Sequence, residues 1–533
     1  MTKEETLKKY FGHDGFREGQ EPLIDSLLNG HDAVGIMPTG AGKSICYQIP
    51  AVMLDGVAIV VSPLISLMKD QVNALNQMGI PAAYLNSSLT ERQFRIALSR
   101  AYHGAYKIIY VAPERLDTAG FMQLAESIHI SMITVDEAHC ISQWGQDFRP
   151  GYLRIREFID RLSYRPVIGA FTATATAHVR DDIINILKLD KPRVVTTGFD
   201  RKNLYFGVEH PRDKMLALMR ILKKNRDKSG IIYCSTRKNV EEVCSKLCQK
   251  GYDATRYHAG LEEEEKILNQ EDFLYDRKTV MVATNAFGMG IDKSNVSFVI
   301  HYNMPKDLES YYQEAGRAGR DGEEAECILL YAKKDVSLAK WLLNNSAPNE
   351  MLTEEQREEV KKRDLERLKQ MTFYSTTNRC LRQFILNYFG DHRQCTCGKC
   401  SSCCPEKQIE PRNSENSSNT RRTRVSDIYV SDRDDYGMGE WYARQAVKKP
   451  VSNTPFTEKE EELFGILKAL RSEKAKIAGV PAFVVFTDAA LRDMCKKKPK
   501  TKTEFLEVSG VGQAKADRYA AAFTAAIKKF ING

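Results

Sequence analysis

Two short stretches hold residue types and spacings suited to binding and splitting a nucleoside triphosphate. The first is MPTGAGKS (37–44), which follows the apolar run AVGIM. Its glycines would let backbone N–H groups approach phosphates at the start of a helix, with Lys43 reaching the β and γ phosphates and the Ser44 hydroxyl ligating Mg²⁺. Met37 replaces the first glycine of the usual GxxxxGK[ST] pattern. The loop predicts nucleotide contacts at Thr39, Gly40, Ala41, Gly42, Lys43 and Ser44.

The second stretch, VDEAH (135–139), places two acids directly after the apolar run 130–135. An acid at the end of a buried strand can hold Mg²⁺ through water, and a neighbouring acid can orient the attacking water. Asp136 and Glu137 suit these two roles, and His139 follows them. Acids at a helix N-terminus are also common for electrostatic reasons alone. Together with the glycine-rich loop, the pair predicts phosphoryl-transfer chemistry.

The segment SQWGQDFRP (142–150) has side chains suited to a flat, anionic partner. Trp144 and Phe148 can stack on bases at about 1 to 3 kcal/mol each, and Arg149 can pair with a phosphate or stack. Few residues separate them from Glu137, so a partner that orders this segment could position the catalytic carboxylate. An alternative stays open for Phe148, which could pin the loop as a core aromatic.

The elements that must position these residues form two series of short apolar runs separated by amphipathic helical stretches. Such runs indicate parallel strands buried on both faces, so we expect an α/β fold with two tandem parallel-sheet domains. The runs are AVGIM, VAIVVS, KIIYVAP, MITVDEAH and VIGAFTAT, then GIIYCST, TVMVAT, VSFVIHY and ECILLY.

The rest of the chain predicts three further parts. A helical region ending in a cysteine cluster comes first, followed by a polar segment with too few aliphatic residues for a core, and then a small all-helical domain. The expected boundaries of the five parts are 1–200, 201–335, 336–404, 405–454 and 455–533.

The composition is that of an ordinary globular protein of 533 residues, with 28% charged and 42% hydrophobic residues and a net charge of +8. Residues 455–533 hold 15 Lys and Arg against 10 Asp and Glu, an excess that suits either an anionic partner or a solvated face. No apolar run approaches the roughly 18 residues needed to cross a bilayer, and the start lacks the apolar core of a signal peptide. We expect a cytoplasmic protein without a membrane partner, nucleoid-associated if it is bacterial.

Several motifs occur in the order and spacing of a superfamily 2 helicase. They are PTGAGKS, SPLISLMKDQV (62–72), APERL (112–116), DEAH, TATAT (172–176), ATNAFGMGIDK (283–293) and QEAGRAGRDG (313–322). More narrowly, FGHDGFREGQ (11–20) and DEAHCISQWGQDFRP resemble the RecQ family of DNA helicases, over residues 10–404. The resemblance implies two RecA-like parallel-sheet domains, a helical zinc-binding subdomain and a small C-terminal all-helical domain.

The resemblance also implies roles for individual residues. An arginine that arrives from the second domain can stabilise the transferring phosphoryl by about 10³ to 10⁵ in rate, and Arg320 is favoured over Arg317 for this role. A surface salt-bridge pair is the alternative for these two arginines. The implied adenine contacts are Phe16, Arg17 and Gln20; hydrolysis adds Gln313, Arg317 and Arg320; coupling to DNA uses His139, Trp144, Phe148, Arg149, Thr172 and Thr174.

One position departs from the family, which usually has His where this chain has Gln146. An amide can donate and accept hydrogen bonds but cannot titrate or carry charge. The departure puts the strength of coupling between DNA and ATP hydrolysis in question.

The string CTCGKCSSCC (395–404) is dense enough to predict a metal site in a reducing compartment. Three of its cysteines have C-x2-C-x2-C spacing, and the helix CLRQFILNYF begins with another cysteine. The RecQ zinc-binding subdomain uses this pattern, so the resemblance favours Zn²⁺ held by Cys380, Cys397, Cys400 and Cys403. An iron–sulfur cluster is the main alternative, but the ferredoxin spacing needs a cysteine where Lys407 stands.

RecQ proteins commonly carry a winged-helix domain after the zinc site. Only 405–454 separates the cysteines from the next folded pattern, near the size of about 40 residues below which unaided folding is rare. We therefore expect this domain to be absent or severely reduced. The tail resembles the helical domain shared by helicases and RNase D. Its lysines between 496 and 502 and the turn 510–512 suit phosphates, or else a solvated loop on a protein-contact module.

The resemblance implies an ATP-dependent DNA helicase that moves 3′ to 5′ on single-stranded DNA and unwinds duplexes in recombination and repair, with ATP, Mg²⁺ and Zn²⁺. The implied partners are single-stranded, tailed and forked duplex DNA, with single-strand-binding and repair proteins as further candidates. Two other classes stay open. A DNA-stimulated translocase or remodeller that barely unwinds is favoured by the missing winged helix. A non-enzymatic DNA-binding scaffold is opposed by the retention of Lys43, Asp136, Glu137 and Arg320.

Overall fold

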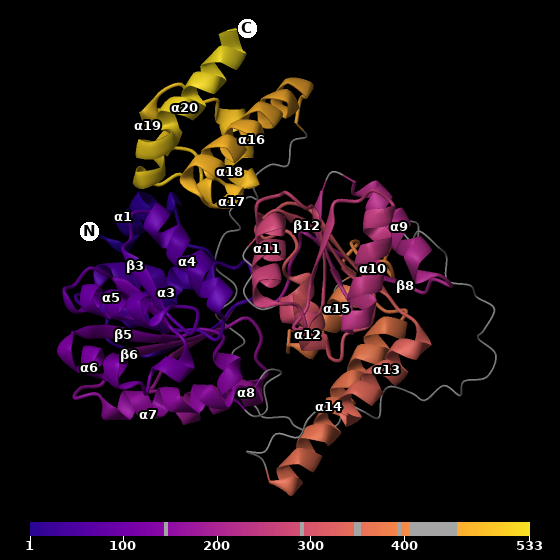
Figure 1. The fold of residues 1–533 in the computed structure, drawn as a ribbon, viewed down its shortest axis with the longest axis horizontal. Helices are drawn as coiled ribbons and strands as arrows, with labels where there is room; N and C mark the ends of the chain where they lie inside the picture. Colours follow the sequence, from indigo (N-terminus) through magenta and orange to yellow (C-terminus); the bar gives the residue numbers. More distant parts are fainter. Residues whose placement is uncertain are drawn as a thin grey trace.

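The computed structural model describes residues 1–142, 148–226, 228–287, 293–345, 353–391, 396–404 and 456–532. Two α/β lobes lie side by side, a long helical hairpin extends from the second lobe, and a helical C-terminal domain packs over both lobes (Figure 1). These parts confirm the predicted fold class. None of the described helices is both long and apolar enough to cross a membrane.

Lobe 1 is built on a seven-stranded parallel sheet in the order β3-β4-β2-β5-β6-β1-β7. Its central strand β2 shows why an unbroken apolar run is needed. Val57, Ile59 and Val61 join one hydrophobic cluster, whereas Ala58 and Val60 join another. Because side chains alternate along a strand, both faces of the sheet are buried under helices.

The elements of lobe 1 alternate between strand and helix. The strands are β1 (Ala33–Ile36), β2 (Val57–Val61), β3 (Ala82–Leu85), β4 (Ile108–Val111), β5 (Ile130–Val135), β6 (Val167–Thr172) and β7 (Arg193–Thr196). The main helices are α2 (Gln20–Leu28), α3 (Lys43–Met53), α4 (Ile65–Gln77), α5 (Glu91–Tyr102), α6 (Ala119–Ser127), α7 (Leu153–Arg161) and α8 (Ala177–Leu187), after the short turns α1 (Lys3–Thr6) and η1 (Leu7–Phe11).

Lobe 2 repeats the design with a six-stranded parallel sheet in the order β10-β11-β9-β12-β13-β8. The strands are β8 (Leu204–Glu209), β9 (Ser229–Tyr233), β10 (Ala254–Tyr257), β11 (Val280–Ala283), β12 (Val296–His301) and β13 (Ala325–Leu330). The helices are α9 (Lys214–Lys224), α10 (Arg237–Gln249), α11 (Glu263–Leu274) and α12 (Leu308–Ala315).

The apolar runs predicted every inner strand of both sheets but missed four strands, β3, β7, β8 and β10. These four are the two edges of each sheet. β7 illustrates the cause, because most of its residues are exposed and its sequence RVVT is short and partly polar. An edge strand such as β7 is paired on one side only, so it needs less apolar surface and gives a weaker sequence signal. β8 differs, because it is largely buried.

The helical hairpin consists of α13 (Lys333–Asn344) and α14 (Glu354–Thr376), and α15 (Leu381–Tyr388) follows it. The cysteine loop then runs beside the edge strand β8. Phe206 donates its N–H to the Lys399 carbonyl at 3.3 Å, and Ser401 donates its N–H to the Phe206 carbonyl at 2.9 Å. The loop therefore covers the open edge of the lobe 2 sheet. The polar segment 405–454 lies outside the described residues. The expected absence of a winged-helix domain therefore stays a prediction.

The C-terminal domain packs its own hydrophobic cluster between α16 (Glu458–Ala478), α17 (Ala482–Val485), α18 (Asp488–Lys497), α19 (Lys502–Leu506) and α20 (Gln513–Asn532). Its glycine turn faces lobe 1. Gly510 donates its N–H to the Gly12 carbonyl at 2.9 Å, and Val511 is fully buried. The N–H of Gly510 is thus engaged with protein in this arrangement rather than turned toward a phosphate.

The same domain also reaches lobe 2. The Tyr275 hydroxyl donates to the Gly479 carbonyl at 3.1 Å, and the Arg492 guanidinium lies 3.2 Å from the Glu323 carboxylate. Glu323 directly follows the motif QEAGRAGRDG. The C-terminal domain therefore contacts both lobes, as Figure 1 also shows for the helices above α1, α4 and α11.

Candidate nucleotide site between the lobes

The glycine-rich loop lies between β1 and α3, as its sequence predicts. Gly40 and Gly42 have φ angles of 84° and 82°, in the left-handed region that glycine adopts without strain. A Cβ on Gly42 would stand 2.4 Å from the side-chain nitrogen of Gln20. Both glycines are therefore required by the local backbone, and the second also by the close approach of Gln20.

Lys43 joins the two acids of VDEAH in one buried cluster. Its Nζ lies 3.1 Å from Asp136 Oδ1 and 3.3 Å from Glu137 Oε1. Burial opposes the charged ammonium, but the two carboxylates outweigh burial and raise the pKa of Lys43 above its ordinary value. Burial raises the pKa of Asp136. In Glu137 burial is outweighed by Lys43 and other cations, which lower its pKa, so Glu137 is ionised at neutral pH.

Glu137 has an unusual backbone, with φ at 48° and ψ at 46° in the left-handed region. For a residue other than glycine this conformation costs on the order of 1 to 2 kcal/mol. It directs the carboxylate toward the cluster, where Oε1 meets Lys43 and Oε2 lies 3.4 Å from His139 Nδ1. The backbone strain thus falls on Glu137, the residue predicted to orient the attacking water.

The predicted adenine-binding residues lie beside the loop. Gln20 is buried and donates to the Gly42 carbonyl at 3.0 Å, and Arg17 donates to the Gly40 carbonyl. Phe16 is partly buried against the hydrophobic cluster that contains α2 and α3. The structure therefore places all three residues at the nucleotide loop, and their contact with adenine stays a prediction.

The second lobe brings its motif QEAGRAGRDG to the same place. Thr39 of the loop donates its hydroxyl to the Gly316 carbonyl at 3.2 Å, across the two lobes. Arg317 is buried, burial lowers its pKa, and its charge helps to lower the pKa of Glu137. Arg320 is close enough to Arg317 for its charge to lower the pKa of Arg317 further, and both cations lie near Tyr233. Gln313 lies on α12, which leads into this segment.

A chain of polar contacts leads from Glu137 to TATAT: an ion-pair contact joins Glu137 Oε2 to His139 Nδ1, and hydrogen bonds continue from His139. His139 Nδ1 lies 2.8 Å from Thr172 Oγ1, and Thr172 donates its hydroxyl to the Thr174 carbonyl at 3.1 Å. Because the single hydroxyl proton of Thr172 goes to that carbonyl, Thr172 accepts from His139. The three coupling residues predicted around this motif thus form one buried network with Glu137.

The aromatic segment is described only in part. Trp144 and Gln146 lie outside the described residues. Phe148 is partly buried, which leaves both its stacking and its core roles open. Arg149 donates from Nη1 to the Pro63 carbonyl at 3.1 Å, so it contacts the motif SPLISLMKDQV rather than standing alone. Its pairing with DNA phosphate stays a prediction.

One residue of this site was missed from the sequence. Arg201 reaches the phosphate loop and the motif of lobe 2 at once, with its Nη1 2.5 Å from the Thr39 carbonyl and its Nη2 2.9 Å from the Gly319 carbonyl. It belongs to no recognised motif and stands one residue past the expected domain boundary. That position at the junction is the only signal that the sequence offers.

The predicted zinc ligands form one cluster. The sulfur atoms of Cys380, Cys397, Cys400 and Cys403 all lie within 4.8 Å of one another. Tetrahedral Zn²⁺ with Zn–S bonds of about 2.3 Å requires neighbouring sulfurs about 3.8 Å apart, and Cys397 and Cys403 are 3.9 Å apart. The four thiols therefore fit the ion. Cys395 lies outside the described residues, and Cys404 Sγ instead contacts the Gly398 carbonyl.

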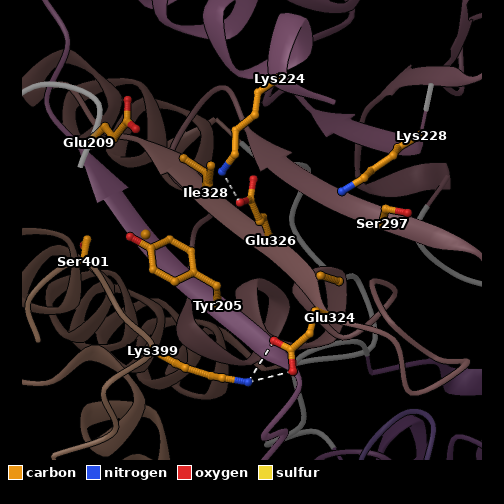
Figure 2. A pocket seen from close by; sticks show the side chains of 12 residues that line it. Tyr205, Glu209, Lys224, Lys228, Ser297, Glu324, Glu326, Ile328, Lys399 and Ser401 are labelled. Carbon is orange, nitrogen blue, oxygen red and sulfur yellow. Dashed lines mark hydrogen bonds and ion pairs between the residues drawn. The ribbon is translucent and has the colours of Figure 1, made fainter. Parts of the chain in front are cut away.

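A separate hollow of about 380 Å³ lies at the lobe 2 sheet edge, between β8, β13 and the cysteine loop (Figure 2). Opposite charges pair on its walls, with Lys224 beside Glu326 at 2.5 Å and Lys399 beside Glu324 at 2.7 Å. None of the residues predicted to bind or hydrolyse the nucleotide lines it. The chemistry is therefore assigned to the interface of the lobes and not to this hollow.

Fold and site together define a protein of two RecA-like lobes with a phosphate-binding loop at their interface. At the level of fold alone, the chain is similar to the Mycobacterium smegmatis helicase Lhr bound to ssDNA and AMP-PNP, with a TM-score of 0.51 and 20% identity over 62% of this chain and 48% of that one. It is also similar to the DEAD-box helicase Mss116 bound to ssRNA and UDP-BeF, with a TM-score of 0.53 and 19% identity over 73% of this chain and 86% of that one.

The chain belongs to the RecQ helicase family. It is 38% identical to a Bacillus subtilis protein named ATP-dependent DNA helicase RecQ, over 98% of each chain. It is 35% identical to the protein of that name from Pasteurella multocida, over 99% of this chain and 94% of the relative. Four families match along it: DEAD/DEAH box helicase at 17–183, helicase conserved C-terminal domain at 213–322, RecQ zinc-binding at 333–404 and HRDC domain at 460–527.

Proposed function

We propose that this protein is an ATP-dependent DNA helicase that moves 3′ to 5′ along single-stranded DNA and separates duplexes in recombination and repair. The observation that carries the proposal is the buried cluster of Lys43, Asp136 and Glu137, which Arg317 faces from the other lobe. The names of the full-length relatives support DNA as the substrate.

Each residue of the cluster has a role in hydrolysis. Lys43 binds the β and γ phosphates, for which it exchanges its present contacts with the acids. Glu137 is ionised and accepts a proton of the attacking water, which it thereby orients. Ser44 and Asp136 would hold Mg²⁺, which neutralises phosphate charge when it is bound. Arg317 and Arg320 stabilise the charge on the transferring phosphoryl from lobe 2.

Coupling to DNA would use the relay from Glu137 through His139 to Thr172. The relay leaves the nucleotide site at the carboxyl end of β6, and TATAT continues from there. A shift of this segment on DNA binding moves Thr172, its hydrogen bond moves His139, and His139 changes the electrostatic contact with Glu137. The role of Trp144, Phe148 and Arg149 in sensing the strand belongs to the same proposal, as do single-strand-binding and repair proteins as partners.

Strand displacement from tailed duplexes tests the proposed function. A duplex with a 3′ single-stranded tail, one with a 5′ tail and one with blunt ends are incubated with ATP and Mg²⁺. We expect the strand to be released from the 3′-tailed duplex only. Glu137→Gln, which keeps the shape of the side chain and removes its charge, serves as the control and should release none. Release from the 5′-tailed duplex alone would contradict the polarity.

A second candidate function is a DNA-stimulated translocase that unwinds weakly. The alignment with the Bacillus relative runs over 588 positions, more than the 533 residues of this chain, so the relative has residues with no counterpart here. A reduced duplex-gripping part would favour this function. It predicts that streptavidin is displaced from the 5′ end of single-stranded DNA while no duplex is separated. Efficient separation of the 3′-tailed duplex would exclude it.

A further inference from the structure

Arg201 binds backbone oxygens in both halves of the nucleotide site. Its Nη1 donates to the Thr39 carbonyl of the phosphate loop at 2.5 Å and lies 3.3 Å from the Gly316 carbonyl. Its Nη2 donates to the carbonyls of Ala318 at 3.0 Å and Gly319 at 2.9 Å. One guanidinium therefore connects lobe 1 to three carbonyls of the lobe 2 motif.

The lobe 2 carbonyls that Arg201 binds belong to residues adjacent in sequence to the two predicted phosphate-binding arginines. Gly316 and Ala318 flank Arg317, and Gly319 precedes Arg320. Fixing the direction of these carbonyls fixes the peptide planes, and with them the directions in which the Arg317 and Arg320 side chains leave the backbone. A displacement of about 1 Å in such a group can cost about 10²-fold in rate.

The charge of Arg201 is not balanced by an acid among the described residues. Each acceptor of its side chain is a neutral oxygen, the fifth being Asn203 Oδ1 at 3.4 Å. Burial lowers its pKa, and the nearby charges of Arg320 and Arg17 act in the same direction. The planar fork of an arginine suits several carbonyls at once. A cation held there at electrostatic cost suits a site that receives a polyanion.

The zinc-binding subdomain holds the backbone that carries Arg201. Arg382 on α15 is nearly buried and donates from Nη1 to Asp200 Oδ1 at 2.7 Å and to the Arg201 carbonyl at 2.6 Å. Its Nη2 donates to the Leu204 carbonyl. α15 begins directly after Cys380, one of the four clustered cysteines. The junction between the lobes is thus also anchored by the zinc-binding subdomain.

We propose that Arg201 is a positioning residue for ATP hydrolysis. It holds the phosphate loop and the segment 316–320 in the register in which Arg317 and Arg320 reach the transferring phosphoryl. It should therefore govern kcat and leave the affinity for ATP nearly unchanged. This proposal rests on the ATP hydrolysis proposed above.

The test is steady-state ATP hydrolysis with saturating single-stranded DNA in wild type, Arg201→Met and Lys202→Met. Lys202 is the neighbouring cation with an exposed side chain, so its variant is the matched control. We expect kcat of Arg201→Met to fall by about 10²-fold with KM for ATP within about threefold. Lys202→Met should behave as wild type. Arg201→Lys keeps the charge with a single donor group, and we expect an intermediate kcat.

A double-mutant cycle separates positioning from a merely structural role. If Arg201 acts through the arginines of lobe 2, Arg201→Met should lower kcat by less than about twofold in an Arg317→Ala or an Arg320→Ala background. A full loss of about 10²-fold in both backgrounds would overturn the proposal. So would a wild-type kcat in Arg201→Met, or a raised KM at unchanged kcat. A wild type without ATP hydrolysis would overturn the proposed function as well.

Discussion

The two halves of the nucleotide site differ in how their charges are held. In lobe 1 Lys43 lies against Asp136 and Glu137, so a cation and two anions compensate one another before any ligand arrives. In lobe 2 the interface holds two guanidiniums, of buried Arg317 and of the partly buried junction residue Arg201, whose pKa values burial lowers. The charges in the lobe 1 half therefore compensate one another. The cations in the lobe 2 half suit the binding of an anion.

The difference indicates a division of work between binding and rate. The lobe 1 residues sit on one rigid sheet, at the ends of β1 and β5, and would bind nucleotide whatever the position of the other lobe. The lobe 2 residues act only where the lobes meet, here through Thr39, Gly316 and Arg201. Changes in lobe 1 should therefore remove binding and hydrolysis together, and changes in lobe 2 should remove hydrolysis alone.

The largest effect is expected for Lys43→Ala. Removing the ammonium takes away a phosphate contact and leaves two buried acids facing each other, so we expect ATP hydrolysis to fall by at least about 10³-fold and nucleotide binding to weaken as well. Phosphate release and binding of a fluorescent ATP analogue measure both. Lys223→Ala, on the exposed side of α9, is the control. Equal hydrolysis in wild type and Lys43→Ala would establish the non-enzymatic scaffold instead.

A smaller effect is expected for Thr172→Val, which keeps the shape of the side chain and removes the hydroxyl that accepts from His139. A hydrogen bond of this kind contributes about 1 kcal/mol. We expect basal hydrolysis to stay near wild type and stimulation by single-stranded DNA to fall by about five- to tenfold. Thr196→Val, at an exposed position of β7, provides the comparison. Unchanged stimulation would mean that coupling takes another route.

The smallest effect concerns the contact of the C-terminal domain with lobe 2. Burial beside Glu323 and Asp488 raises the pKa of Asp321 to about 6. A carboxyl with a raised pKa favours the packed state below its ordinary pKa, and this contribution is lost as the pH rises through about 6. Asp321→Asn should therefore gain less than about 1 kcal/mol in stability at pH 7.5 and gain nothing at pH 4. Thermal unfolding at both values, with exposed Asp55→Asn as control, measures the difference.

The lobe 1 residues of the nucleotide site could be predicted from the sequence, whereas Arg201 at the junction could not. Lys43, Asp136 and Glu137 lie in contiguous motifs whose local geometry creates their function, so their identity was predictable. Arg201 acts on backbone carbonyls of segments more than one hundred residues away on either side, and carbonyls leave no trace in a sequence. Inner strands were likewise predicted from their unbroken apolar runs.

Edge strands and the docking of the C-terminal domain were not predictable. β7 is short and mostly exposed, so its sequence carries a weak apolar signal. β8 is largely buried, and its sequence LYFGVE was missed because Tyr205, Gly207 and Glu209 interrupt the apolar residues. The turn at Gly510 has the composition of a phosphate-binding loop, yet its N–H is given to the Gly12 carbonyl of lobe 1. A free backbone N–H in such a turn can bind either a phosphate or a protein carbonyl, and the sequence alone does not distinguish the two.

The most direct measurement is ATP hydrolysis with saturating single-stranded DNA in the double variant Arg317→Ala/Arg320→Ala, together with its affinity for a non-hydrolysable ATP analogue. If the site is completed across the lobes, kcat falls by at least about 10³-fold while affinity changes by less than about tenfold. The two single variants then show which arginine dominates, Arg320 being favoured by resemblance and Arg317 by its electrostatic effect on Glu137. A near wild-type kcat in the double variant would contradict the account.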